Sequence, residues 1–520
     1  MIRRLGPATG GASRVVATAT AGAILLLVAL SIALRFLWLD ADAWFPNPSY
    51  ANPLSINFEE KASAIPARNW VLFGEIDSFG GSYQPQAMMP LGFLIHAAWY
   101  RGFGVSLLQT RLPFVLLGVA TFIGMILLAR RQLEPAPLLA FVGAAGLNQT
   151  LLAYQRSCLD ENLFLAFLTL AAFCRPGPEG RARTYAVWGL LAFLALAAKP
   201  TGVIYAAAPA LALAIDLLRD RRGRAWKPLL ALGSGLAAAA GGAFGLYAAL
   251  GFLRQNAFTA WLGTYNKAMG HVPPLSGFGD YLHALERHLP VPEAAERPVL
   301  VLALVAPLLL RRTTFFTRAA WWTFVLAVLS GAPTYLYYKR VVPLAPVVFY
   351  LAAAAGQGIL ERLAVAPETL FLRKVRRLAW GGGAAVWVFC LLSIISYGTR
   401  LTAFDLLERG PVRSYRATSA VLRAAVPPEA RLAAPDAFRL VAFDTPFRYR
   451  FTHDMAARHV EKIDLGQAAL RDACAGGADV LVEARDDPSD PGRQEFAARP
   501  FDRSECPRSG QEDGGARGPA

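Results

Sequence analysis

The stretch LPFVLLGVATFIGMILLARR, residues 112–131, indicates the class of protein to which this chain belongs. Its first 18 residues carry no charge, and the arginines Arg130 and Arg131 follow them. Such a run approaches the roughly 20 apolar residues that cross a hydrocarbon core of about 30 Å. The whole chain is 55% hydrophobic and only 17% charged. The sequence therefore predicts a polytopic α-helical membrane protein.

Other apolar runs of similar character bring the expected number of transmembrane helices to about eleven. The predicted spans are 15–38, 112–129, 136–152, 161–174, 184–199, 201–218, 229–252, 298–310, 319–338, 341–360 and 378–398. The first run follows a basic start, as in a signal sequence, but it is long for one and has no evident small-residue cleavage site. We therefore interpret it as a membrane anchor.

The basic residues between the runs predict the orientation, because short loops rich in Lys and Arg stay in the cytoplasm. Basic clusters occur at every second connection, namely 3–14, 130–131, 175–183, 219–227, 311–318 and 373–377. An odd number of spans that starts inside places the C-terminus outside a plasma (inner) membrane. The net charge of +15 forms no single patch, which argues against a nucleic-acid partner.

Residues 86–104 are apolar enough to be counted as a further span, but that would turn every later basic loop outward. We interpret the segment as an interfacial helix in the first outer loop, 39–111, with Trp99, Tyr100 and Arg101 at headgroup level. The alternative is an ordinary transmembrane helix whose partner lies unrecognised elsewhere in the chain.

Ionisable residues gather in the loops that this topology places outside. They are Glu59, Glu60, Glu75 and Asp77 in the first loop, Asp160 and Glu161 in the second, Lys199 in the third, and Lys339 and Arg340, together with the long loop 253–297. Acids and bases that converge on one membrane surface, beside a loop too long for a simple connector, indicate a site for an amphiphilic substrate.

Two segments near the N-terminus resemble GT-C superfamily glycosyltransferases. They are NFEEKASAIPARNW (57–70) and the stretch 83–131, which begins YQPQAMMPLGFLIHAAWYRGFG. The resemblance is to protein O-mannosyltransferases and lipid A aminoarabinose transferases in particular. Those enzymes carry an Asp-Glu pair in the first outer loop, a Lys-Pro-Pro-Leu-like segment and then Arg-Leu-Pro. This chain has Glu59-Glu60, 86–91 and 111–113 in that order.

Three later segments extend the resemblance over about residues 15–360. AYQRSCLDENLFLAFLTLAAF (153–173) is similar to the family's Arg-x-x-x-Asp segment, which gives Arg156 and Asp160. LAAKPTGVIYAAAP (196–209) gives Lys199, and YYKRVVPLAP (337–346) gives Arg340. The resemblance implies an inverting transferase that moves a hexosyl or pentosyl group from a polyprenyl phosphate to an extracytoplasmic lipid, glycan or protein hydroxyl.

The resemblance also implies roles for individual residues. Glu59 is the expected general base, because partial burial raises the pKa of a carboxyl toward the working pH. Glu60 and Asp160 are candidates for a second acid. Lys199, Arg340 and the neighbouring Lys339 are expected to bind the donor phosphate, and Arg156 and His271 to support the acceptor or the site. The chain departs from the family in having Glu59 instead of Asp and Gln86 instead of Lys.

Each role has a structural alternative. Glu59 and Glu60 could belong to the solvated first turn of a surface helix, and Arg156 and Asp160 could form a helical ion pair. Lys199 and Arg340 could be interfacial anchors, and His271 an ordinary loop histidine. The histidines fit no zinc template. A divalent cation, if one binds, could be shared by the oxygen atoms of Glu59 and Asp160.

From residue 401 the composition becomes charged and mixed. The segments 426–435, 438–451 and 477–484 predict strands, and 466–477 predicts a helix. We therefore predict a small extracytoplasmic α/β domain over 401–506, with a candidate disulfide between Cys474 and Cys506, followed by a disordered tail over 507–520.

Two other functional classes remain open. One is a transporter or lipid flippase, and the other is an inactive relative that binds a lipid-linked sugar. Transporters usually place polar residues at mid-membrane on broken helices. The spans of this chain are nearly free of acidic residues, which favours chemistry at the membrane surface.

Overall fold

The computed structural model describes residues 11–37, 39, 54–76, 90–156, 158, 162–175, 182–199, 202–219, 226–249, 291–331, 342–364 and 370–402, parts of 419–451, and 480–487 and 490–500. A helix lies in each of the eleven ranges predicted to span the membrane. These helices are α1 (Gly11–Phe36), α5 (Leu107–Ala129), α6 (Pro135–Leu147), α8 (Asn162–Phe173), α9 (Ala182–Ala198), α10 (Val203–Arg219), α11 (Trp226–Ala249), α14 (Glu293–Leu309), α15 (Phe315–Gly331), α17 (Ala345–Ala364) and α18 (Leu370–Thr402).

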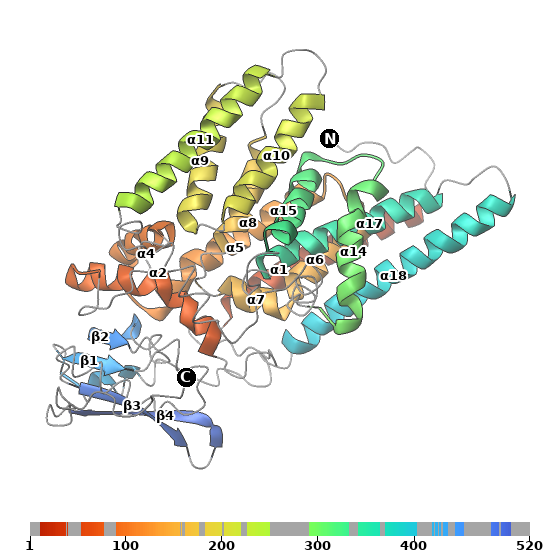
Figure 1. Cartoon of the computed structure of the whole chain (residues 1–520). Coiled ribbons are helices and arrows are strands. Elements are labelled where there is room, and N and C mark those ends of the chain that lie inside the picture. The colour runs from red at the N-terminus through yellow and green to blue at the C-terminus, as the bar shows by residue number, and fades with distance from the viewer. Residues whose placement is uncertain are drawn as a thin grey trace, which may run out of the picture.

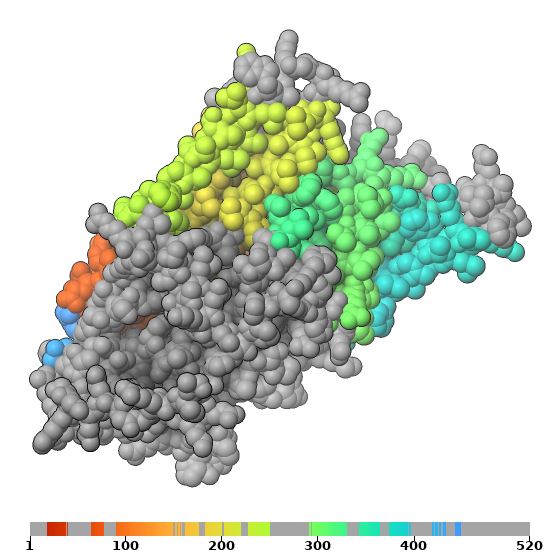
Figure 2. All heavy atoms as spheres, viewed as in Figure 1, coloured from red at the N-terminus to blue at the C-terminus, as the bar shows by residue number. Residues whose placement is uncertain are grey.

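Four helices of the described part, α1, α5, α11 and α18, are long and apolar enough to cross a membrane. In α5, 56% of the apolar window is buried inside the protein, compared with 17% in α11 and in α18. Figures 1 and 2 show α11 and α18 on the two flanks of the molecule. Their exposed side chains include Leu230, Phe244, Leu378 and Leu392. The chain is a multi-pass membrane protein, and eleven crossings remain a prediction.

The span predicted at 136–152 is wrong in one respect, because the helix breaks at Asn148. Helix α6 ends at Leu147, and a separate helix, α7 (Gln149–Arg156), begins directly after Asn148. The side-chain Oδ1 of Asn148 accepts a hydrogen bond from the Leu151 amide at 3.2 Å, as an N-cap residue does. A polar cap therefore starts α7 and brings Arg156 to its end.

The bundle relies on close approach between α17 and its neighbours α14 and α18. A Cβ atom at Gly356 of α17 would lie 2.1 to 2.4 Å from atoms of the Trp387 indole on α18. Trp387 is itself buried. No side chain larger than hydrogen fits at Gly356 unless the two helices separate.

We expect Gly356→Ala to destabilise the protein by about 1–3 kcal/mol, because it overpacks a rigid ring contact. The measurement is the thermal unfolding midpoint in detergent micelles. Gly382→Ala is the matched control, since a Cβ atom there meets nothing within 4 Å and alanine favours a helix by up to about 1 kcal/mol. Equal midpoints for the two variants would contradict the prediction.

The first outer loop contains α2 (Leu54–Phe73) and α4 (Pro90–Phe103), which pack against each other. With 14 residues, α4 is about 21 Å long, but α6 and α8 are shorter still, so the assignment of α4 as an interfacial helix remains a prediction. The placement of residues 99–101 at headgroup level remains a prediction, but Tyr100 faces the interior of the protein. Tyr100 is 1% exposed, and its hydroxyl is 2.7 Å from Thr110 Oγ1 on α5, because α4 turns this side toward the bundle.

The C-terminal region forms a four-stranded sheet in the order β2-β1-β3-β4. Its strands are β1 (Arg431–Ala434), β2 (Arg448–Phe451), β3 (Val480–Asp487) and β4 (Asp490–Pro500). Strand β1 is parallel to β2 and β3, and β4 is antiparallel to β3. Figure 1 shows the sheet at one end of the bundle, beside α2 and α4. The helix predicted at 466–477, Cys474, Cys506 and the tail lie outside the described residues.

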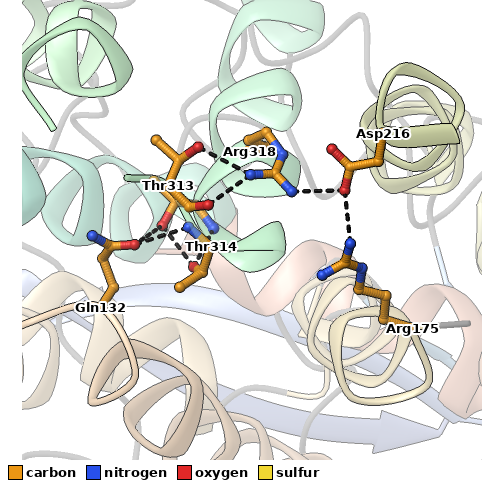
Figure 3. A network of polar contacts seen from close by, with 7 residues as sticks. Gln132, Arg175, Asp216, Thr313, Thr314 and Arg318 are labelled. Atoms are coloured by element: carbon orange, nitrogen blue, oxygen red, sulfur yellow. Dashed lines mark hydrogen bonds and ion pairs between the residues drawn. The ribbon is translucent and has the colours of Figure 1, made fainter. Parts of the chain in front are cut away.

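A polar network joins several connections between helices near the C-terminal end of α8 (Figure 3). Asp216 Oδ2 accepts from Arg318 at 2.6 Å and from Arg175 at 3.1 Å. Gln132 Oε1 accepts from the Thr314 amide at 2.9 Å. The connections that carry Gln132, Arg175 and Thr314 are all predicted to be cytoplasmic. Their meeting at one end agrees with the alternation of the basic clusters, and the cytoplasmic side remains a prediction.

Candidate functional site

Four basic side chains are buried near the helix ends that face the sheet side of the bundle. Arg35 lies in the last turn of α1, Arg111 in the second turn of α5, Arg156 at the end of α7, and Lys199 directly after α9. Lys199 is the most exposed of them, at 8%. A buried cation is costly unless hydrogen bonds or an anion compensate its charge, so the surroundings of each one matter.

Arg35 joins α1 to α7. Its Nε donates to Gln155 Oε1 at 2.8 Å, and its Nη2 donates to the same oxygen. Its Nη1 donates to the Ser31 carbonyl at 2.7 Å, and the guanidinium lies 4.8 Å from the centre of the Phe122 ring. Among the described residues these partners are neutral. Gln155 immediately precedes Arg156, so Arg35 holds the turn of α7 from which Arg156 projects.

The end of α7 is also held to the start of α8. Asn162 Nδ2 donates to the carbonyl of Tyr154 at 2.9 Å. Arg156 is therefore fixed from two sides, and it is buried. Asp160, its predicted partner, lies outside the described residues, so the helical ion pair and the role of Asp160 as a second acid remain predictions.

A tight turn positions Lys199 between α9 and α10. The Gly202 amide donates to the Lys199 carbonyl at 2.8 Å. A Cβ atom at Gly202 would lie 2.0 Å from the Ala195 carbonyl oxygen and 3.0 Å from the Phe164 ring. The turn therefore packs against α8, the same helix that holds the end of α7. The burial of Lys199 disfavours the alternative of an exposed interfacial anchor.

The 3-10 turn η2 (Val342–Leu344) contacts both α7 and α8. The turn begins two residues after Arg340 in the chain, and it lies against α7, which ends at Arg156, and against α8, which borders the Lys199 turn. Lys339 and Arg340 themselves lie outside the described residues, as does His271 on the long loop.

Glu59 and Glu60 lie on α2, where the structure describes the backbone and not their side chains. Helix α2 begins at Leu54, which places both residues in its second turn. The favourable effect of the helix dipole on carboxylates is confined to the first turn. The first-turn alternative therefore loses its basis, and the assignment of Glu59 as the base remains a proposal.

Within the part of the chain that the structure describes, no group of three His, Cys, Asp or Glu side chains could hold a metal ion. The side chains of Glu59 and Asp160 are not among those described. A divalent cation shared by these two carboxylates therefore remains a prediction.

His96 is a buried histidine that packs α4 against the start of α5. Its Nδ1 lies 2.9 Å from the Gly92 carbonyl oxygen and its Nε2 3.2 Å from that of Thr110, and its ring stacks on Phe114 at 5.0 Å. Burial lowers the pKa of His96 from 6.5 to about 4, although the two carbonyls act in the opposite direction. The imidazole is therefore neutral in the folded protein at neutral pH.

Acidification should destabilise the protein through His96. The unfolded chain takes up this proton near pH 6.5 and the folded chain only near pH 4, so stability present above pH 6.5 is lost as the pH falls toward 4. The loss should be on the order of 3 kcal/mol. The measurement is the unfolding midpoint between pH 7 and pH 4 for the native chain and His96→Gln. Parallel pH curves for the two proteins would contradict the prediction.

No protein-family model and no curated protein sequence matches the chain. Two solved structures of ArnT from Cupriavidus metallidurans do match, one in the apo state and one bound to undecaprenyl phosphate. Both structures are 16% identical to this chain in sequence. Each match covers 89% of this chain and 93% of ArnT, and the TM-scores are 0.50 for the apo state and 0.51 for the bound state. The chain shares the fold of ArnT. The resemblance to lipid A aminoarabinose transferases is thus confirmed at the level of the fold.

A third structure, the arabinofuranosyltransferase AftD from Mycobacteria, is similar at a TM-score of 0.44 and 15% identity. The match covers 91% of this chain and 36% of AftD.

Sequence reasoning missed part of what holds this site. Arg35 lies in a span that was interpreted only as an anchor, although a single arginine near the end of an apolar run was a visible signal. Arg111 was noted only as part of a motif. Gln155 carries no signal of its own, because its importance comes from contact with Arg35, 120 residues away.

Proposed function

We propose that the protein is an integral membrane glycosyltransferase that moves a sugar from a polyprenyl-phosphate donor to an acceptor outside the cytoplasm. The observation that carries the proposal is the fold shared with ArnT, together with the cation Lys199, which is buried in a turn that packs against α8. ArnT is itself bound to undecaprenyl phosphate in one of the matching structures, which supports a polyprenyl-linked donor. Buried cations suit a phosphate, because an anion offsets the cost of their burial.

The reaction assigns a distinct task to each group. Glu59 takes the proton from the acceptor hydroxyl, and the acceptor oxygen attacks the anomeric carbon of the donor. The bond from that carbon to the phosphate oxygen breaks, and the configuration inverts. The polyprenyl phosphate leaves with the electron pair of this bond, and Lys199, Arg340 and Lys339 stabilise its charge. Arg156 and His271 support the acceptor side of the site.

The test is a comparison of envelope lipids, glycans and glycoproteins by mass spectrometry. Source cells that lack the gene are compared with the same cells restored with the native chain. A sugar that disappears on deletion and returns on restoration would support the proposal and identify both sugar and acceptor. Unchanged sugars, or accumulation of an intact lipid-linked sugar on one side of the membrane, would favour the transporter or flippase instead.

A further inference from the structure

The C-terminal region is attached to the first outer loop by a buried arginine. Arg68 of α2 is fully buried. Its Nη2 donates to two main-chain carbonyls, those of Thr445 and Phe447, each at 2.7 Å. Its Nη1 donates to Asn69 Oδ1 at 2.8 Å. We define residues 443–448 as the clamp segment, because one side chain joins it to a helix more than 370 residues earlier in the chain.

The clamp segment also reaches the helix bundle. Asp444 Oδ1 accepts from the Leu107 amide at 3.0 Å. Leu107 is the first residue of α5, where a carboxylate is favoured by the helix dipole. The aromatic rings of Phe443 and Phe447 are buried, so the segment is packed as well as hydrogen-bonded. It thus connects α2 to the start of α5.

The pattern of buried residues along α2 shows that the clamp segment helps to enclose this helix. Residues 64–69 are six consecutive buried positions, although one face of a helix supplies only about half of its residues. Helix α4 covers one side, and the clamp segment covers the position of Arg68. The enclosed stretch begins five residues after Glu59, about 8 Å along the helix axis.

We propose that Arg68 is a positioning residue: by holding the clamp segment against α2, it fixes the helix that carries Glu59. This inference rests on the proposed function, because it assigns Arg68 an effect on the transfer step. Its forked guanidinium reaches two carbonyls and a side-chain amide at once, which the single amine of lysine cannot reproduce fully. A carboxylate that must meet a proton within hydrogen-bond distance is sensitive to displacements of about 1 Å.

The experiment uses the full chain with Arg68→Ala, Arg68→Lys and, as a control at the edge of the same interface, Glu75→Gln. Glu75 lies two residues after α2, its ion pair with Arg448, at 2.8 Å, is exposed, and exposed pairs contribute little. Three quantities are measured: the rate of sugar transfer in restored cells, binding of undecaprenyl phosphate to the purified protein, and hydrogen exchange of the amides in the clamp segment.

We expect Arg68→Ala to lower transfer at least 10-fold and to increase exchange in the clamp segment, while undecaprenyl phosphate binding stays within 2-fold of native. Arg68→Lys should recover part of the transfer, and Glu75→Gln should change it less than 2-fold. Native transfer by Arg68→Ala would overturn the inference, as would a parallel loss of binding and transfer in both Arg68 variants, which would indicate a structural role alone.

The two proposals fail differently. If the native chain transfers no sugar, the proposed function fails, and the role of Arg68 in transfer fails with it. If the native chain transfers sugar and Arg68→Ala does so equally well, only the inference fails.

Discussion

Glu59→Gln should lower sugar transfer by about 10²- to 10⁴-fold, the contribution typical of a positioned general base. Glutamine keeps the size and hydrogen-bonding capacity of the side chain but cannot take the proton of the acceptor hydroxyl. Glu59→Asp keeps the carboxylate and should retain part of the activity, because it matches the residue of the family motif. The measurement is the initial rate of appearance of the sugar identified by the deletion, at equal amounts of protein.

The matched control for this prediction is Glu75→Gln. Glu75 follows the same helix, but its carboxylate is 58% exposed and pairs with Arg448 at the surface, so its removal should change transfer less than about 2-fold. Full transfer by Glu59→Gln would show that Glu59 is not the base. If both Glu59 variants yield the sugar product at the native rate, a carrier explains the data better than a transferase does.

Gly202→Ala should reduce transfer by about 100-fold, because it displaces Lys199. The new Cβ atom would lie 2.0 Å from the Ala195 carbonyl oxygen and 2.7 Å from its carbon. Both are backbone atoms of α9, so the contact is relieved only if the turn or the helix moves. The Gly202 amide is bonded to the Lys199 carbonyl, and a shift of about 1 Å at a catalytic group costs roughly this factor.

Two measurements separate the causes of such a loss. The unfolding midpoint reports the overpacking, which should cost about 1–3 kcal/mol, and undecaprenyl phosphate binding reports the position of Lys199. Gly241→Ala on α11 is the control, since a Cβ atom there meets nothing within 4 Å. If Gly202→Ala transfers sugar and binds undecaprenyl phosphate as the native chain does, the Lys199 turn is not part of the site.

The differences between expectation and structure have local causes. Asn148, Gln149 and Thr150 form a short polar interruption between the apolar residues of α6 and Leu151 and Leu152, and a span of about 20 residues extends across it, so length and hydropathy did not separate α6 from α7. Strand β4 begins with Asp490, Pro491 and Gly492 and contains charged residues, a composition that disfavours strands. It forms because its neighbour β3 supplies a full antiparallel partner. At β4, strand pairing therefore outweighed local composition.

The resemblance to family motifs in the sequence singled out Lys199 and Arg156, and the structure buries both side chains, while their roles in a site remain proposals. The supporting residues Gln155 and Arg68 were not identified as such. A glutamine or arginine in a polar stretch is usually exposed, and only its surroundings in the fold distinguish a buried residue from a surface one.

The sequence by itself determined that this is a helical membrane protein and which segments contain its apolar helices. The reason is that a bilayer requires long apolar runs, and such runs are visible without knowledge of the fold. Only the tertiary structure decided which distant groups meet, such as Arg35 with Gln155, Arg68 with the clamp segment, and Gly356 with Trp387. These contacts depend on hydrogen-bond direction and on the separation of packed helices. Both are set by the assembled bundle, and neither leaves a periodic signal in the sequence.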